Sequence, residues 1–543
     1  MQLRATQINV EKGIPFAQLD PDVHLAAFAA EVPYHEDPAS QHERHTWKLA
    51  SVLWDPLEDL PKFDYSGSEL ESYVEEKRRK ELLGKFLEEL VEHDANYQAK
   101  TVSTAEEAAF AHLTAHRIEQ ACAILLEVGN FRLATLIPQV GGDQEVRDKI
   151  KSQIHQWRSR GILAEIAAPV RALYELVAGE TCFSEGVKGP LEDAAPSFFL
   201  ADVFHLDWRR NLALKLWYGT QEDEGISAAV GAYEADIAAY PEKPFVPTAY
   251  YSRTAAHTDT LWNLLKLYSE PSLELSSALT PRTFSENPLS LRLPWQLHTI
   301  LSRLNIRSSP ELTKLTTDFA TTLATTDNWE YAIFILLHLP SPTQRQSAIR
   351  AIIAQNIHHL TPDKHFFLTT TLRIPPTWLH EARALFARSV AKHIEETEHL
   401  IRAGSWAEAH KTLTTHVAPE AVISADHEPL KRILAMFTDR ANIDGWAVGG
   451  QVFADYVQLL EGRGDKDKGV VLERLMRSLP QMSKRGFLQG VAVELVGKEV
   501  AKCARKQEKC GGVLELPLGG GERVREVVKC GLEGWKTRLG VVG

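Results

Sequence analysis

Two histidines, His112 and His116, lie four residues apart in a segment with helical periodicity. This spacing would place two ring nitrogens on one face of a helix, as in zinc proteins that add a glutamate base and a third ligand. Here the intervening residues are Leu-Thr-Ala, and no third ligand follows in the pattern. We therefore interpret both histidines as structural or surface residues, and we predict that the protein binds no metal.

The other histidines, the cysteines and the glycine-rich stretches also do not match the motif of a known catalytic, metal or nucleotide site. His35, His42 and His45 cluster in an acidic, proline-containing segment, which favours a solvated loop over a metal site. The sequence contains no phosphate-binding loop, no nucleophile elbow and no dinucleotide fingerprint. The five cysteines are odd in number and widely spaced, which is typical of a reducing compartment. We expect no cofactor and no enzymatic activity.

Composition points away from two further classes of partner. The chain has 543 residues with 60 basic and 72 acidic side chains, a net charge of −12, whereas nucleic-acid binding needs a basic surface. The longest strongly apolar run, residues 331–339, is far shorter than the roughly 20 residues that span a bilayer. We expect no direct contact with nucleic acid and no membrane insertion.

A short pattern marks the elements that would position any site. A glycine ends an apolar-periodic stretch, an aromatic residue follows two positions later, and an alanine follows three positions after that. The pattern occurs at Gly129, Phe131 and Ala134 and again at Gly404, Trp406 and Ala409, while Trp329 and Ala332 repeat the aromatic-to-alanine spacing. Such a pattern is typical of a helical hairpin, in which glycine forms a left-handed C-cap and the small residue allows close helix packing.

The hairpin interpretation makes specific predictions. Gly129 and Gly404 should have positive φ, and Phe131 and Trp406 should be largely buried. Chains that repeat such hairpins form stacked helical arrays, which mostly act as scaffolds or binding surfaces. The sequence therefore predicts an all-α stack.

The chain divides by composition into four predicted segments. Residues 1–65 alternate at Leu3, Ile8 and Val10 and carry many turn-forming residues, which predicts strands and turns that need a partner sheet. Residues 66–460 read as the main helical domain and residues 461–499 as a helical extension. Residues 500–543 are rich in glycine and predict a disordered tail.

Four segments, in order along the chain, resemble a known family. They are Thr46-Trp-Lys-Leu-Ala-Ser-Val-Leu-Trp54-Asp, Asp207-Trp-Arg-Arg-Asn-Leu-Ala-Leu-Lys-Leu-Trp217-Tyr, Asn328-Trp-Glu-Tyr-Ala-Ile-Phe334, and Gly445-Trp-Ala-Val-Gly-Gly-Gln-Val-Phe453-Ala-Asp-Tyr456. The family comprises nucleoporins released as the C-terminal half of a self-cleaving precursor. Its members are the animal nucleoporin of about ninety-six kilodaltons and the C fragment of fungal nucleoporin 145. The self-cleavage domain is absent from this sequence.

The resemblance implies a folded-back, J-shaped helical stack, the ancestral coatomer element, with a trunk, a crown and a tail. It also implies a scaffold subunit of the Y-shaped complex at the nuclear pore, in the nuclear envelope, supporting pore assembly, mRNA export and protein transport. In that family a segment before the helices completes a small β-propeller shared with the COPII vesicle coat. The crown and the tail meet other coatomer-like nucleoporins. Leu3, Ile8 and Val10 would then be candidate propeller-binding residues.

Three other functions fit parts of the pattern. A COPII-like vesicle-coat subunit would share the fold and also bind a propeller. An α/α enzyme would need acid and base residues that converge in a cavity, and the sequence identifies none. An importin-like receptor would show regular repeats of about 40 residues, whereas the hairpins here are irregularly spaced.

Overall fold

The chain folds mainly into α-helices, which confirms the predicted all-α class. Strands occur in the described residues only as two short antiparallel pairs, β1 with β2 and β3 (Phe183–Ser184) with β4 (Phe198–Phe199). The computed structural model describes residues 1–34, 37–57, 69–190, 194–241, 243, 245–252, 257–304, 306, 311–461, 465–482, 486–506 and 510–538.

The chain forms two compact units. Unit 1 comprises residues 1–7 and 18–322, and unit 2 comprises residues 8–17 and 323–543. This division falls inside the segment 66–460, which the sequence analysis treats as one domain. The predicted boundary at residues 65 and 66 lies outside the described residues.

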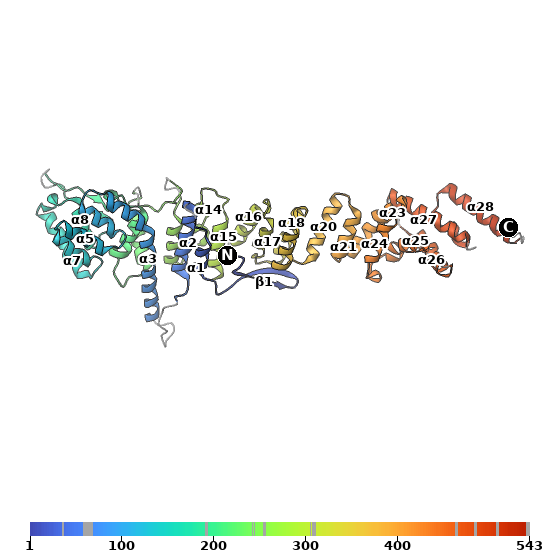
Figure 1. Cartoon of the computed structure of the whole chain (residues 1–543), viewed down its shortest axis with the longest axis horizontal. Helices are drawn as coiled ribbons and strands as arrows, with labels where there is room; N and C mark the ends of the chain where they lie inside the picture. The colour runs from blue at the N-terminus through green and yellow to red at the C-terminus, as the bar shows by residue number, and fades with distance from the viewer. Residues whose placement is uncertain are drawn as a thin grey trace. The chain divides into compact units, whose positions relative to one another are not determined.

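Unit 1 runs outward along a long helix and then returns beside it. After α3 the chain forms α4 to α9, and then α10 and α11 pack against α3 while α12 packs against α2. Figure 1 labels α2, α3, α5, α7 and α8 among these helices. The helices are α1 (Leu25–Glu31), α2 (Pro38–Trp54), α3 (Glu69–Thr101), α4 (Ala105–Leu113), α5 (Ile118–Glu127), α6 (Phe131–Leu136), α7 (Gln144–Ser159), α8 (Ala168–Val177), α9 (Leu200–Val203), α10 (Trp208–Leu214), α11 (Ile226–Ala239), α12 (Thr260–Ser269), α13 (Leu275–Ala278), α14 (Pro281–Phe284), α15 (Arg292–Arg303) and α16 (Leu312–Ala324).

In unit 2 many helices contact their neighbours in sequence, as α17 with α18, α20 with α21 and α25 with α26, while α27 returns to pack on α23. Figure 1 labels most of these helices. The helices are α17 (Trp329–Leu336), α18 (Pro342–Asn356), α19 (Pro362–Phe366), α20 (Pro376–Ser389), α21 (His393–Arg402), α22 (Trp406–Thr412), α23 (Ala418–Ser424), α24 (Glu428–Met436), α25 (Gly450–Glu461), α26 (Asp465–Ser478), α27 (Phe487–Lys506) and α28 (Gly520–Arg538).

Short 3₁₀ and π segments extend or connect these helices. The 3₁₀ segments are η1 (Ile137–Gln139), η2 (Ile162–Glu165), η4 (Ile357–His359), η7 (Arg440–Asn442), η8 (Trp446–Val448), η9 (Leu479–Gln481) and η10 (Cys510–Glu515), and the π segments are η3 (Lys215–Gly219), η5 (Phe367–Thr371) and η6 (Leu413–Val417).

The N-terminal segment differs from its prediction. Strands extend only over β1 (Thr6–Glu11) and β2 (Ile14–Leu19), and helices α1 and α2 follow, so the expectation of strands and turns throughout residues 1–65 is wrong. Proline disrupts the interior of a helix but is favoured in its first turn. Pro38 occupies the first turn of α2, where its missing N–H costs nothing, and Asp37 caps the helix by accepting from the N–H of Ser40.

Helix α2 belongs to the core of unit 1. Trp47, Leu49 and Leu53 of this helix are fully buried, and the ring of Trp47 stacks on Phe28 of α1 with 4.7 Å between ring centroids. Residues 1–65 are therefore not a separable segment, because removing them would strip one face from the core of unit 1.

The C-terminal tail also differs from its prediction. Residues 500–506 continue α27, η10 follows, and Gly520 begins α28, so the expectation of a disordered tail is wrong for these residues. The connection is anchored because Val513, Leu516 and Leu518 are buried in the core of unit 2. Gly511 and Gly512 lie in η10, and Gly519, Gly520 and Gly521 lie just before α28 and in its first turn, so these glycines stand at the ends and connections of the long helices.

Candidate interaction surfaces

The two histidines with metal-ligand spacing do not share a helix. Helix α4 ends at Leu113, and His116 follows in a turn with a φ of +57°. Its Nδ1 lies 2.6 Å from Glu88 Oε1, and its ring stacks on Trp217. Burial, with the nearby charge of Arg117, lowers the pKa of His112. Among the described residues no group of three or more His, Cys, Asp or Glu is arranged to hold a metal ion.

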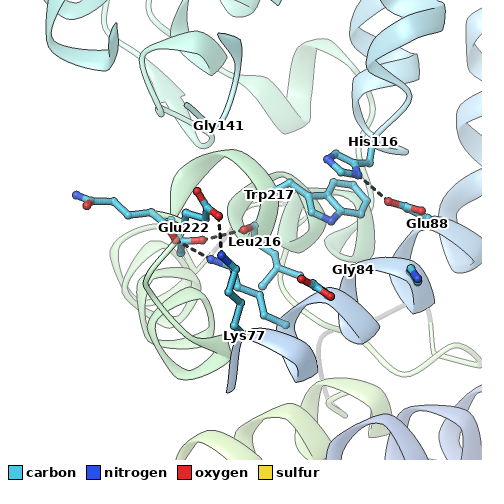
Figure 2. A pocket seen from close by; sticks show the side chains of 13 residues that line it. Lys77, Gly84, Glu88, His116, Gly141, Leu216, Trp217 and Glu222 are labelled. Atoms are coloured by element: carbon cyan, nitrogen blue, oxygen red, sulfur yellow. Dashed lines mark hydrogen bonds and ion pairs between the residues drawn. The ribbon is translucent and has the colours of Figure 1, made fainter. Parts of the chain in front are cut away.

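A cleft of about 400 Å³ lies between α3 and the segment around η3 (Figure 2). Lys77 and Gly84 line it from α3, Trp217 and Glu222 line it from the opposite side, and His116 closes one end. Gly84 allows the close approach of the indole, because a Cβ at this position would lie 3.1 Å from Trp217 Nε1.

Lysines in this cleft hold the loop that follows η3. Lys77 Nζ lies 2.7 Å from Glu222 Oε1, and Lys80 Nζ donates to the carbonyl oxygens of Gln221 and Glu224 at 2.7 Å each. Burial lowers the pKa of Lys80, while the hydrogen bond to Glu222 raises that of Lys77. These contacts connect the outgoing and returning parts of unit 1, which is a structural role.

A buried histidine and carboxylate in unit 1 have the residue types of an acid–base pair. His42 Nε2 lies 3.7 Å from Asp259 Oδ1, and Arg209 lies 3.6 Å from the other carboxylate oxygen. Burial lowers the pKa of His42 to about 3 and raises that of Asp259 to about 6. Asp259 also caps α12 by accepting from the N–H of Leu261. Because His42 is only 5% exposed, a substrate cannot reach the pair.

The N-terminal hairpin places the three candidate propeller-binding residues in different environments. Leu3 precedes β1 in a turn and is half-buried, Ile8 is buried, and Val10 is exposed. Residues 8–17 of the hairpin belong to unit 2, and the N–H of Ala17, within β2, donates to the carbonyl of Leu337 of the same unit at 2.9 Å. Since the described sheet has only two strands, β1 keeps an outer edge.

The α5–α6 joint has the predicted backbone but not the predicted burial. Gly129 has a φ of +78°, and Ala134 is buried. Phe131, however, is 66% exposed, so the expectation of a buried ring is wrong. The buried stripe of α6 is formed by Leu133, Ala134 and Ile137, and at 100° per residue Phe131 lies roughly 110° away from its centre. The exposure of Phe131 could therefore be predicted from a helical wheel of the sequence.

The other two joints cover their aromatic residues to different degrees. Gly404 has a φ of +80°, Ala409 is fully buried and Trp406 is half-buried beside Phe437, with 6.0 Å between ring centroids. Trp329, which begins α17, is 1% exposed, and Ala332 is fully buried.

The exposed joint creates an apolar surface in unit 1. Leu126 and Val128 at the end of α5 are exposed together with Phe131 at the start of α6, and we call these three residues the tip patch. Exposed apolar patches of this kind mark sites of protein interaction. The patch includes a glycine turn at Gly129, which fixes the spacing between the two helix ends.

None of the described helices is both long and apolar enough to cross a membrane. A family described as "Nuclear protein 96" matches residues 107–386. This match covers most of unit 1 and the first helices of unit 2.

Curated proteins with similar sequences are nucleoporins. Nucleoporin nup189 of Schizosaccharomyces pombe is 30% identical over 508 residues, which cover 88% of this chain and 28% of that protein. Nucleoporin NUP145 of Chaetomium thermophilum is 29% identical, covering 84% of this chain and 24% of that protein. Nuclear pore complex protein Nup98-Nup96 of Drosophila melanogaster is 28% identical, covering 76% and 21%. The chain thus spans about a quarter of the length of these relatives.

Proposed function

The chain belongs to the nuclear protein 96 family and is a nuclear pore protein, and we propose that it is a non-enzymatic scaffold subunit of the Y-shaped complex of the pore. In this role it supports pore assembly, mRNA export and protein transport by holding other nucleoporins in place. The candidate acid–base pair is buried and the histidines are structural, which supports a scaffold over an enzyme.

The tip patch carries this proposal. Leu126, Val128 and Phe131 are exposed at one turn, although Leu133 and Ala134 of the same joint are buried. Three neighbouring apolar side chains in water are unfavourable for a free protein and favourable for one that buries them against a partner. We propose that this patch binds the helices of another coatomer-like nucleoporin.

Affinity purification of the tagged full chain tests the tip patch. We expect other nucleoporins to be recovered in stoichiometric amounts, and we expect the variant Val128→Asp to lose one of them while keeping its melting temperature. Val390→Asp is the matched control, because Val390 is an exposed valine at the C-cap of α20, in the turn before α21. If Val128→Asp retains every partner, the tip patch is not an interface.

We further propose that the β-propeller partner pairs with the outer edge of β1. Since Ala17 of β2 already donates a backbone hydrogen bond to Leu337, insertion of the whole hairpin into a propeller would break this contact. Strand addition to β1 leaves it intact and supplies backbone hydrogen bonds at an edge. Ile8 then anchors the hairpin to its own chain, while Val10 faces the partner.

The variant Val10→Asp tests the strand-addition proposal. Val10 is 47% exposed, so we expect the fold to be unaffected and capture of the propeller to fall. Val390→Asp again serves as the control, since Val390 is 46% exposed. Undiminished capture by Val10→Asp would place the propeller interface elsewhere on the chain.

A further inference from the structure

Helix α28 presents an apolar face to solvent. Its 19 residues include five apolar side chains that are between 40% and 66% exposed. They recur at intervals of three or four residues and therefore lie along one side of the helix. These residues, which we call the α28 stripe, are Val524, Val527, Val528, Leu532 and Trp535.

The opposite side of α28 is bound to its own chain through charges. Glu522 forms an ion pair with Lys498 of α27, and Glu526 lies 2.8 Å from Arg505 of the same helix. The guanidinium of Arg523 donates to the carbonyl of Leu516 in the preceding connection. The helix thus packs by its acidic face and exposes its apolar face, the reverse of an ordinary surface helix.

Basic residues border the α28 stripe. Arg525 and Lys529 are exposed and lie one turn apart along one edge of it, and Lys529 Nζ also lies 3.4 Å from Glu526 Oε1 on the same helix. The surrounding segment, residues 500–543, has nine basic and five acidic residues, although the whole chain has a net charge of −12. Glu522 and Glu526 pair with α27, and Glu526 also pairs with Lys529, so the outer side of α28 combines the apolar stripe with Arg525 and the exposed side chain of Lys529.

We propose that α28 binds an anionic phospholipid surface. A convex stripe on a single helix needs no complementary groove when it enters the boundary between headgroups and acyl chains, whereas a protein partner would have to supply one. Arg525 and Lys529 at its edge match negatively charged headgroups, and a tryptophan such as Trp535 favours the interfacial region of a bilayer. The helix lies on the membrane and does not span it.

This inference goes beyond the scaffold role, because it gives the C-terminal end of unit 2 a second kind of partner. It does not depend on the tip patch, which lies in unit 1. A scaffold that binds other nucleoporins through unit 1 and lipid through α28 would connect the protein assembly to a bilayer.

Vesicle flotation with the full chain tests the proposal. We expect the protein to float with vesicles of phosphatidylcholine and phosphatidylserine and to stay behind with phosphatidylcholine alone, with binding that weakens as salt is raised. The variant carrying both Val528→Glu and Leu532→Glu should bind the anionic vesicles about tenfold less. The variant carrying Arg525→Glu and Lys529→Glu should also lose binding.

Val470→Glu is the matched control, because Val470 is an equally exposed helical valine of unit 2, in α26. Its vesicle binding should equal that of the unchanged chain, and all variants should keep the same melting temperature. The proposal is overturned if the chain ignores anionic vesicles or if the stripe variant floats as well as the control. Loss of a nucleoporin from the stripe variant without loss of flotation would identify the stripe as a protein interface and would also overturn it.

Discussion

The α5–α6 joint and the α21–α22 joint share one residue pattern but differ in how far the aromatic residue of the pattern is buried. Both have a glycine with φ near +80° and a buried alanine. Phe131 of the first joint faces solvent, while Trp406 of the second is half-buried. A local pattern therefore determines the backbone conformation of the turn, but it does not determine whether the aromatic side chain is buried.

The difference has a physical source in the residues that lie beside each ring. Trp406 lies beside Phe437, which in turn contacts Trp446 with 5.0 Å between ring centroids, so residues distant in sequence supply its cover. Phe131 lies off the buried stripe of its own short helix, and it stays exposed. A covered aromatic stabilises the fold, whereas an exposed one is available to a partner.

Trp329→Ala should have the largest effect on stability among the three joints. Its ring is fully enclosed, so the substitution leaves a cavity and should lower the free energy of unfolding by about 3–5 kcal/mol. Chemical denaturation followed by circular dichroism measures this loss. Trp535→Ala is the control and should change stability by less than about 0.5 kcal/mol, because its ring is exposed. Equal losses for both variants would contradict the buried position of Trp329.

Trp406→Ala should cost less, about 2 kcal/mol, because part of the ring is already in water in the folded state. The remaining loss comes from its contact with Phe437. Double-variant analysis with Phe437→Ala provides the check. The two substitutions should be non-additive, since they remove the same contact. Strictly additive losses would show that Phe437 does not contribute to the burial of the Trp406 ring.

Gly129→Ala and Gly404→Ala should destabilise the protein equally, by about 1–2 kcal/mol each, through the cost of a left-handed conformation. An added Cβ would meet no atom within 4 Å at either position, so sterics contribute nothing. Gly231→Ala in α11 is the control, because it is also open but helical, and it should be stabilising by about 0.5–1 kcal/mol. A large difference between the two joint glycines would show that their backbones are not equivalent.

These cases indicate which features were predictable from sequence. The fold class and the turn conformation at Gly129 and Gly404 follow from periodicity and from a local conformational preference. The burial of Trp406 depends on Phe437, which lies thirty-one residues later, and no local pattern contains it. The exposure of Phe131 follows from the helical wheel, because Leu133, Ala134 and Ile137 form the buried side of this segment and Phe131 lies away from it.

The two chain ends show the same limit. Pro38 counts as a turn-forming residue by its type, although after Asp37 it has the position of a helix-starting proline. The glycine-rich end was interpreted as disordered from composition, although Val513, Leu516 and Leu518 are apolar residues that the core of unit 2 buries. Composition averages over a window, whereas one buried side chain is enough to hold a connection in place. The candidate interaction surfaces could not be predicted from the sequence, because the exposure of a side chain depends on which residues pack beside it in the folded chain.

Phe131→Ala should have the smallest effect on stability and a large effect on binding. Because the ring is mostly in water, its removal should change the free energy of unfolding by less than about 0.5 kcal/mol. Leu133→Ala, two residues away on the same helix but buried, should cost about 2–5 kcal/mol and provides the structural comparison. If the tip patch binds another nucleoporin, Phe131→Ala weakens that capture while the melting curve stays in place. A clear fall in stability without loss of capture would show that Phe131 serves the fold after all, and the contrast between the two joints would disappear.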